Sequence, residues 1–363
     1  MMLRINKGYN LTKIFLIIIA VLLLLNLQGK DHLKLEYPEN IEYSVVTNTL
    51  NLSSLTLEQK LAQMVIIFGE DETADSFKNM FIGGVFFNGQ KTPEIYERKI
   101  NNYQEGAIVP FFVVADMEGC LNPFENFQNF PSFSEIETSE DAFELGKQAG
   151  LMLKHLGFNM NFAPVLDLED KIMNCRSFPG TLEEISLKGQ KFIEGLHAAG
   201  IMAVAKHYPG GTLSGADTHK DIAGATITAE DLEPFKNAMV AGVDGIMINH
   251  VIVKGAIDSK GVPSVVSPEV VGSLSGFSGF RITDEINMLG LAENYATTNV
   301  NEMFVQLVEA GNDMLLSFDR SPLHIYRMIR AIARAVDEGR IPEAQIDNSV
   351  KKILMLKGIN VVE

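Results

Sequence analysis

One stretch of the chain shows the alternation on which its fold depends. It reads MNFAPVLD at residues 160–167, LEEISLKGQKFIEGLHAA at residues 182–199 and MAVAKHYPG at residues 202–210. The first and third parts are short apolar runs typical of buried strands, and the middle part has the length and apolar spacing of a helix. Together they predict one strand–helix–strand unit of an α/β fold.

The same alternation continues from Leu55 to the end of the chain. Further helix-like segments cover residues 139–156 and 229–241. Eight strand–helix alternations predict a single (β/α)8 TIM barrel, and the chain length of 363 residues accommodates this fold. The eight predicted strands are Ile82–Phe87, Phe111–Ala115, Met160–Leu166, Met202–Lys206, Gly245–Asn249, Ser264–Val266, Arg281–Thr283 and Asp313–Ser317.

The N-terminal segment has the layout of an export signal. Basic residues precede an apolar run at residues 14–25. The run is shorter than the roughly 20 apolar residues of a spanning helix, and no good cleavage site follows it. We expect residues 1–30 to be a signal peptide or a membrane anchor acting through residues 14–27. A linker at residues 31–54 and a catalytic domain at residues 55–363 would follow, in an exported (periplasmic or extracellular) protein.

Composition excludes some classes of protein. A hydrophobic content of 46% and a charged content of 21% describe a globular chain with a substantial core. The net charge of −16 argues against a nucleic acid partner, because phosphate backbones bind basic surfaces. We expect a monomer.

The chain has two cysteines, Cys120 and Cys175, which are too few for a disulfide framework. Export would permit one bridge between them. Their spacing in the sequence does not show their distance in the fold, and we interpret them as two buried thiols.

Polar residues gather where the predicted strands end. Active sites of (β/α)8 barrels lie at the carboxyl ends of the strands, so this pattern predicts a catalytic site there. The residues are Asp116 and Glu118 after the second predicted strand, Asp167 after the third, Lys206 and His207 at the end of the fourth, Asn249 and His250 at the end of the fifth, and Asp284 and Glu285 at the end of the seventh.

Two short segments supply the groups that a retaining glycosidase needs. Asp284 or Glu285 could attack an anomeric carbon, or Asp284 could cap the following helix. Adjacent strand residues point to opposite faces, so only one should face the substrate, and spacing leaves the choice open. Asp217 could orient His219 as a general acid and base. A chance Asp–x–His pair in a solvated loop is the competing interpretation.

Other residues could bind the substrate or, in principle, a metal. Lys206, His207 and Arg176 are donors that could hold sugar hydroxyls, and carboxylates near Asp116 could accept from them. The competing interpretation is a network of salt bridges at the barrel rim. His207 could also ligate zinc together with the Asp217–His219 segment, but its position at a strand end favours sugar hydroxyls, and we expect no metal.

Several blocks of the sequence, in order, resemble the family-3 glycoside hydrolases, in particular the single-domain bacterial β-N-acetylhexosaminidases. The resemblance extends from Leu55 to Lys357, and its first block looks like the first strand of the family. The blocks are Ile82–Phe87, Ala115–Gly119, Asn161–Asp167, Arg176–Phe178, Lys206–Gly210, Asp217–His219, Phe280–Met288 and Ala310–Leu316.

The resemblance implies a mechanism and a substrate. Asp284 would be the nucleophile of a retaining double displacement, and His219, polarised by Asp217, would be the acid/base. The substrate would be a peptidoglycan-derived or related glycan with a non-reducing terminal β-N-acetylglucosamine, cleaved without metal or cofactor. The residues implied to surround that sugar are Asp116, Arg176, Lys206 and His207.

The chain also departs from the family pattern. Cys120 replaces a glycine, the basic residues that follow in the family are replaced at residues 121–124, and Gly211 stands where the family has a histidine. These changes keep other hypotheses open: a weakened barrel that binds glycan at the cell surface, a β-glycosidase for another sugar, or substrate assistance by the acetamido group at the acidic pair Asp284–Glu285. The leaving-group sugar, and water or phosphate as final acceptor, also stay open.

Overall fold

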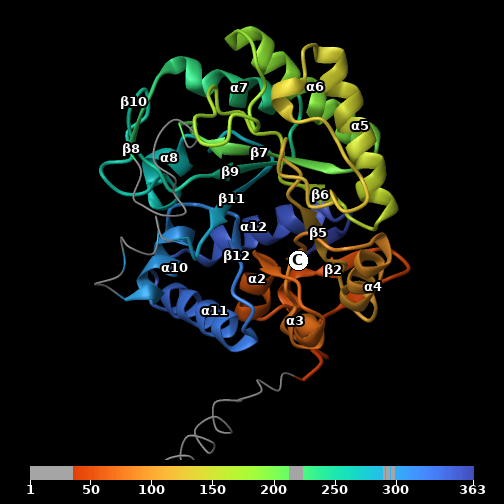
Figure 1. Cartoon of the computed structure of the whole chain (residues 1–363). Helices are drawn as coiled ribbons and strands as arrows, with labels where there is room; N and C mark the ends of the chain where they lie inside the picture. The colour runs from red at the N-terminus through yellow and green to blue at the C-terminus, as the bar shows by residue number, and fades with distance from the viewer. Residues whose placement is uncertain (1–35, 212–223, 289–290, 292–294, 296–298) are drawn as a thin grey trace, which may run out of the picture. The chain divides into compact units, whose positions relative to one another are not determined.

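Eight parallel strands close into a barrel, and helices surround it (Figure 1). This computed structural model describes residues 36–211, 224–288, 291, 295 and 299–363. The predicted (β/α)8 barrel is confirmed. In their order around the barrel the strands are β3 (Val65–Phe68), β4 (Gly84–Phe86), β5 (Phe112–Ala115), β6 (Met160–Asn161), β7 (Met202–Tyr208), β9 (Gly245–Ile248), β11 (Phe280–Glu285) and β12 (Met314–Ser317).

The strands are nearly continuous apolar runs because both of their faces are covered. Every residue of β5, β9 and β12 is buried, as expected for parallel strands between a filled interior and a helical layer. Inside the barrel, Phe112 and Phe280 stack with their ring centroids 6.4 Å apart. Phe86 stacks on Phe162 at 6.3 Å. These rings fill the interior of the barrel as a packed core. The candidate site lies above this core, at the carboxyl ends of the strands.

The helices follow the predicted pattern, and most of those in the described residues begin at a side-chain cap. In α6, for example, Thr181 accepts from the backbone N–H of Glu184, whose side chain accepts from the Thr181 N–H. The helices are α2 (Leu57–Gln63), α3 (Ala74–Met80), α4 (Pro93–Gln104), α5 (Ser139–His155), α6 (Leu182–Ala198), α7 (Ala229–Val240), α8 (Pro268–Gly272), α10 (Val300–Glu309), α11 (Pro322–Asp337) and α12 (Glu343–Leu356).

Helices α5 and α6 lie side by side at unusually short range (Figure 1). A Cβ atom added at Gly146 would lie 2.3 Å from the carbonyl oxygen of Phe192, and one added at Gly195 would lie 2.2 Å from that of Phe143. Only glycine permits this approach of two backbones. The pair thereby fixes the connections that lead into and out of β6.

Two of the strand predictions need correction. Ser264–Val266 is a 3-10 helix rather than a strand, because Pro263 and Pro268 leave too little extended chain between them. The first barrel strand is β3, which the strand predictions omit because Met64 alone separates it from α2 and no turn residue marks its start. The block Ile82–Phe87 therefore forms the second strand, not the first.

The described part of the predicted linker carries regular structure. Strand β1 (Tyr43–Ser44) pairs with β2 (Thr49–Asn51), and β2 pairs with β13 (Asn360–Val362) close to the end of the chain. A second small sheet joins β8 (Gly224–Ile227) and β10 (Ile252–Gly255). Among the described residues, no helix has the length and apolar character needed to cross a membrane. The predicted leader at residues 1–30 lies outside the described part.

The interpretation of Cys120 and Cys175 as two buried thiols is wrong. They form a disulfide, with their Cα atoms 5.6 Å apart. The bond joins the loop after β5 to the loop after β6, although the two cysteines are 55 residues apart in the sequence. Spacing could not predict this, because the two loops meet only when the barrel closes.

Candidate active site

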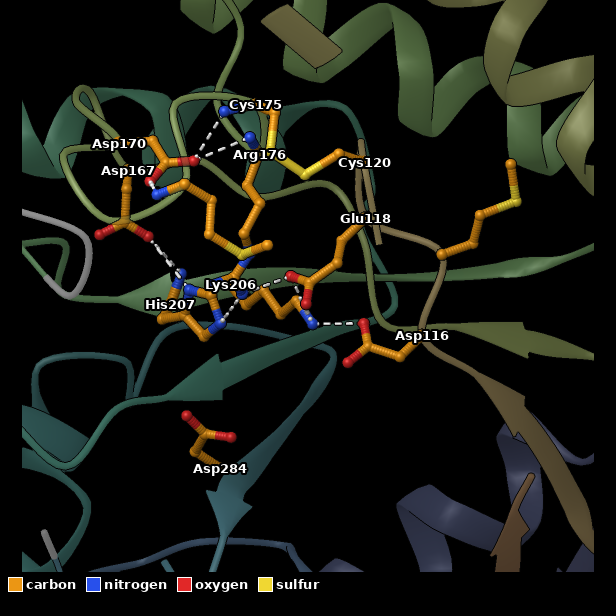
Figure 2. Close-up of polar contacts among 12 residues, drawn as sticks. Asp116, Glu118, Cys120, Asp167, Asp170, Cys175, Arg176, Lys206, His207 and Asp284 are labelled. Carbon is orange, nitrogen blue, oxygen red and sulfur yellow. Dashed lines mark hydrogen bonds and ion pairs between the residues drawn. A yellow bond between two sulfur atoms is a disulfide. The ribbon is translucent and has the colours of Figure 1, made fainter. Parts of the chain in front are cut away.

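The structure brings the four predicted sugar-binding residues together at the carboxyl ends of neighbouring strands. Asp116 follows β5, Arg176 lies in the loop after β6, and Lys206 and His207 lie in β7 (Figure 2). All four lie where the sequence predicts the mouth of the barrel. Asp284, near the end of β11, lies to one side of this group (Figure 2).

Lys206 is the centre of the charged network. Its side chain is 2% exposed and pairs with Asp116, and its Nζ lies 2.9 Å from Oε2 of Glu118. Burial would lower the pKa of Lys206, but the two carboxylates outweigh burial and raise it above its usual value. The lysine is therefore a fixed cation at the floor of the site.

Glu118 joins this lysine to Arg176. Nη2 of Arg176 donates to Oε2 of Glu118 at 2.6 Å, and both side chains are buried. Burial would raise the pKa of Glu118, but Lys206 and Arg176 hold it below its usual range. Glu118 lies at a predicted strand end but is not among the predicted site residues. Its place two positions after Asp116 is the signal that could have identified it.

His207 is oriented by two neighbours. Its Nε2 lies 3.3 Å from Nη2 of Arg176, which can only donate, so Nε2 accepts. Nδ1 therefore carries the proton and donates to Oδ2 of Asp167 at 3.1 Å. The same Asp167 oxygen accepts from the backbone N–H of His207 at 3.2 Å. A buried carboxylate thus fixes both the tautomer and the plane of this imidazole.

The loop that carries Arg176 is wrapped around one carboxylate. Asp170 accepts from the backbone N–H groups of Ile172, Met173, Cys175 and Arg176 at 2.8–3.1 Å. Burial would raise the pKa of Asp170, but these donors lower it below its usual value. The turn presents the guanidinium to the mouth of the barrel. Asp170 is not among the predicted site residues, because its partners are backbone groups, which leave no signal in the sequence.

Asp284 and Glu285 face different surroundings. Oε1 of Glu285 accepts from the backbone N–H groups of Asn287 at 3.0 Å and Phe318 at 2.9 Å, so this carboxylate stabilises the backbone at the rim of the barrel. Oδ1 of Asp284 accepts from the N–H of Glu285 at 2.8 Å. Burial would raise the pKa of Asp284, but nearby His250 and the backbone N–H of Glu285 hold it below its usual range. Asp284 is thus an ionised carboxylate that lies to one side of the charged network around Lys206 (Figure 2).

His250 reaches this position through a contact with β11. Its Nε2 donates to the carbonyl oxygen of Glu285 at 2.8 Å. The residue before it, Asn249, donates to the carbonyl oxygens of His207 at 3.2 Å and Gly210 at 3.1 Å. These bonds tie the ends of β7, β9 and β11 together and keep the imidazole near Asp284.

Asp116 differs from its partners because 31% of its side chain is exposed. Burial, and then repulsion by Glu118, raises its pKa to about 6, although Lys206 acts in the opposite direction. It borders a cavity of about 530 Å³ that reaches the surface. Phe86 and Phe318, stacked with centroids 4.7 Å apart, form an apolar side of that cavity. A carboxylate beside an apolar wall suits a sugar, which has hydroxyls and an apolar ring face.

Two predicted catalytic residues, Asp217 and His219, lie outside the described residues. The zinc hypothesis, which included both together with His207, therefore has one member in the described part. Within that part, no group of three or more His, Cys, Asp or Glu side chains could hold a metal ion.

Known proteins share both the sequence pattern and the fold. Residues 56–356 match the family model described as glycosyl hydrolase family 3 N terminal domain. The chain is 24% identical over 336 residues to beta-hexosaminidase LpqI of Mycobacterium tuberculosis, covering 84% of each protein. It is 30% identical over 264 residues to a beta-hexosaminidase of Tolumonas auensis, covering 68% of this chain and 78% of that one.

Among solved structures, a glycoside hydrolase family 3 beta-N-acetylglucosaminidase from Paenibacillus superimposes with a TM-score of 0.76 at 30% identity. The match covers 84% of this chain and 62% of the Paenibacillus chain. The barrel, the charged mouth and the extent of the family match lead to one conclusion: this chain belongs to glycoside hydrolase family 3.

Proposed function

We propose that this protein is a retaining β-N-acetylhexosaminidase that removes non-reducing terminal β-N-acetylglucosamine from glycans. The observation that carries the proposal is the ionised carboxylate of Asp284. It lies at the mouth of the barrel, to one side of Lys206, Arg176 and His207 (Figure 2). Relatives named beta-hexosaminidase, and a solved beta-N-acetylglucosaminidase with the same fold, support the choice of sugar.

In the proposed reaction, the Asp284 carboxylate attacks the anomeric carbon while His219 gives its proton to the departing oxygen. Asp217 orients His219 and stabilises its cationic form. A water then gives its proton to His219 and displaces Asp284, so two inversions retain the configuration. Asp284 suits the role of nucleophile because its pKa lies below the usual range, which keeps it ionised at neutral pH.

The charged network is proposed to hold the sugar. Lys206 and Arg176 would donate to hydroxyls, and the exposed edge of Asp116 would accept from them. Since these groups are already paired with each other, they need little reorganisation when the sugar binds. His207 would offer its ring edge from a fixed orientation.

An exported protein fits the proposed substrate, a peptidoglycan-derived or related amino-sugar glycan. The basic leader and apolar run at residues 1–30 support export, with membrane anchoring through residues 14–27 as the further proposal. The Cys120–Cys175 disulfide supports it independently, since disulfides persist in oxidising compartments.

The test compares two adjacent carboxylates in the full-length chain. Wild type should release 4-nitrophenol from 4-nitrophenyl β-N-acetylglucosaminide much faster than from the β-glucoside. Asp284→Asn should lower kcat by ~10³-fold or more, because a nucleophile is lost. Glu285→Gln is the matched control and should keep activity within about threefold, because Gln Oε1 can still accept from the rim amides.

Mass spectrometry of the wild-type enzyme during turnover sharpens the test. A glycosyl adduct on the peptide that contains Asp284 would support the double displacement and exclude substrate assistance. Equal activity of wild type and Asp284→Asn would refute the assignment. Glycan binding without turnover in the wild type would favour a glycan-binding barrel, a hypothesis that the lost basic residues at positions 121–124 motivate.

A further inference from the structure

The disulfide lies directly beside the sugar-binding network. Cys120 is two residues after Glu118, and Cys175 immediately precedes Arg176 (Figure 2). Glu118 and Arg176 form the buried pair described above, at 2.6 Å. The covalent bond and the ion pair therefore connect the same two loops at almost the same place.

Both loops are shaped for close contact at this point. Glu118 and Leu121 exchange backbone hydrogen bonds of 3.1 and 3.2 Å, so Gly119 and Cys120 form the tip of a tight turn. A Cβ atom added at Gly119 would lie 2.5 Å from the carbonyl oxygen of Cys175 and 3.1 Å from Cα of Arg176. The turn of one loop thus touches the backbone of the other, and glycine is needed there.

Side-chain bonds alone hold Arg176 incompletely. Nη2 binds Glu118 and His207, but Nε is buried without a hydrogen-bond partner among the described residues. A guanidinium can donate five hydrogen bonds in a fixed plane, so contacts at one nitrogen leave its tilt adjustable. A second constraint on the Arg176 backbone would fix that tilt.

The surroundings of the disulfide leave it reachable and leave the loops room to move. Cys120 is exposed, and Cys175 is partly exposed. Both cysteines border a cavity of about 490 Å³ that opens to the surface, and Cys120 also borders the cavity beside Asp116. Since the chain has two cysteines, this is its single disulfide, and no second bridge would hold the loops after its reduction.

We propose that the Cys120–Cys175 disulfide is a positioning clamp for the pair Glu118–Arg176, and that a dithiol reductant opens it and weakens substrate binding. A dithiol gives two electrons and two protons to the disulfide, which becomes two thiols, while the dithiol becomes a disulfide. The loops then separate into the adjacent cavity, and the guanidinium loses its orientation. The enzyme is fully competent only in an oxidising compartment.

The expected effect is on binding rather than on chemistry, because Asp284 lies on β11 and not on either loop. Dithiothreitol-reduced wild type should show a KM for 4-nitrophenyl β-N-acetylglucosaminide raised about five- to tenfold, with kcat within about twofold. The double variant Cys120→Ser/Cys175→Ser should match the reduced wild type and should not respond to dithiothreitol. An unchanged KM after complete reduction, checked by thiol titration, would overturn the proposal.

The kinetic effect rests on the proposed function, but the clamp itself can be tested without a substrate. Hydrogen exchange should become faster after reduction at residues 118–121 and 172–176, while exchange in α11 stays the same. Equal exchange before and after reduction would refute the clamp, whatever the activity. Faster exchange in a protein that cleaves no hexosaminide would support the clamp and refute the proposed function instead. The reduced wild type also serves where the double variant does not fold.

Discussion

The two ends of the barrel both contain buried ion pairs, yet they differ in how completely those pairs are satisfied. At the amino ends of the strands, Asp313 accepts three bonds from Arg281 at 2.9–3.1 Å, one from Ser349 at 2.8 Å and one from Lys352 at 3.0 Å. At the carboxyl ends, Arg176 keeps a buried Nε without a partner among the described residues, and Asp116 stays 31% exposed.

This difference separates a structural network from a candidate binding network. A carboxylate surrounded by donors on all sides has no capacity left for a ligand, so the Asp313 cluster can only stabilise the fold. The network around Lys206 has unused donors and an exposed acceptor beside a cavity. Buried charge alone is therefore weak evidence for a site, whereas buried charge with unused bonding capacity at the carboxyl ends of the strands is strong evidence.

Among the changes that compare the two ends of the barrel, Glu118→Gln should have the largest effect. The change removes the negative charge that pairs with both Lys206 and Arg176. Because losing one partner of a buried ion pair is costly, the free energy of unfolding should fall by about 3 kcal/mol. Because the same cations are proposed to hold the sugar, kcat/KM should also fall ~100-fold. Urea unfolding and steady-state kinetics measure the two effects. Full activity in the folded variant would place Glu118 with the structural network.

Asp313→Asn is the matched change at the other end. It should also cost about 3 kcal/mol, because Arg281 and Lys352 lose their anionic partner. Under conditions in which the variant is folded, kcat/KM should stay within about twofold of wild type. A large loss of kcat/KM with intact folding would contradict the distinction between the two ends.

Asp116→Asn tests the exposed acceptor. Because its side chain is partly exposed, we expect a stability change of about 1 kcal/mol or less, but a KM raised ~10-fold. In wild type, kcat/KM should fall as the pH drops below about 6, because the protonated carboxyl accepts hydroxyl hydrogen bonds poorly. This limb should be absent in the variant. A pH–rate profile unchanged by the substitution would exclude Asp116 as its source.

Because the pKa of Asp116 is raised on folding, its stability effect has the opposite sign to that of a carboxylate whose pKa is lowered on folding, such as Glu118. The folded state binds the proton more tightly between pH 3.8 and about 6, so this group's contribution to stability falls as the pH rises through that range. Asp116→Asn should flatten that part of the stability curve.

The smallest expected effect lies at the amino ends, at His197. Its Nε2 donates to Oδ2 of Asp244 at 2.8 Å, and this bond raises the pKa of His197 above 6.5, although burial opposes it. The stabilisation, below about 1 kcal/mol for a partly exposed pair, is complete below pH 6.5 and is lost as the pH rises through the folded-state pKa. His197→Ala should lower the melting temperature at pH 5.5 more than at pH 8.5. Equal shifts at both pH values would contradict this.

Most barrel strands could be predicted because their signal is local. The runs that form β5, β9 and β12 are short and apolar, and flanking turns separate them from the helices. β3 was missed because Met64 alone separates it from α2, and Ser264–Val266 was mistaken for a strand because two valines outweighed the neighbouring prolines. Where no turn residue separates a helix from a strand, the apolar pattern cannot place the boundary.

The candidate site likewise contains residues that the sequence predicts and residues that it does not. Positions at strand ends identified Asp116, Lys206, His207 and Asp284, and the structure places them at the mouth of the barrel. Asp170 could not be found, because a carboxylate that binds backbone amides leaves no pattern in side-chain types.

What the sequence by itself determined is the barrel and its family, and it predicted the end at which the candidate site lies, because these follow from apolar periodicity and from short blocks of residues. Only the tertiary structure decided which polar groups meet. Glu118 pairs with Arg176 across 58 residues, Lys206 with Asp116 across 90, and Cys120 with Cys175 across 55. Contacts of this kind depend on the closure of the barrel, which brings loops from neighbouring strands to one rim, and no local pattern encodes their distances.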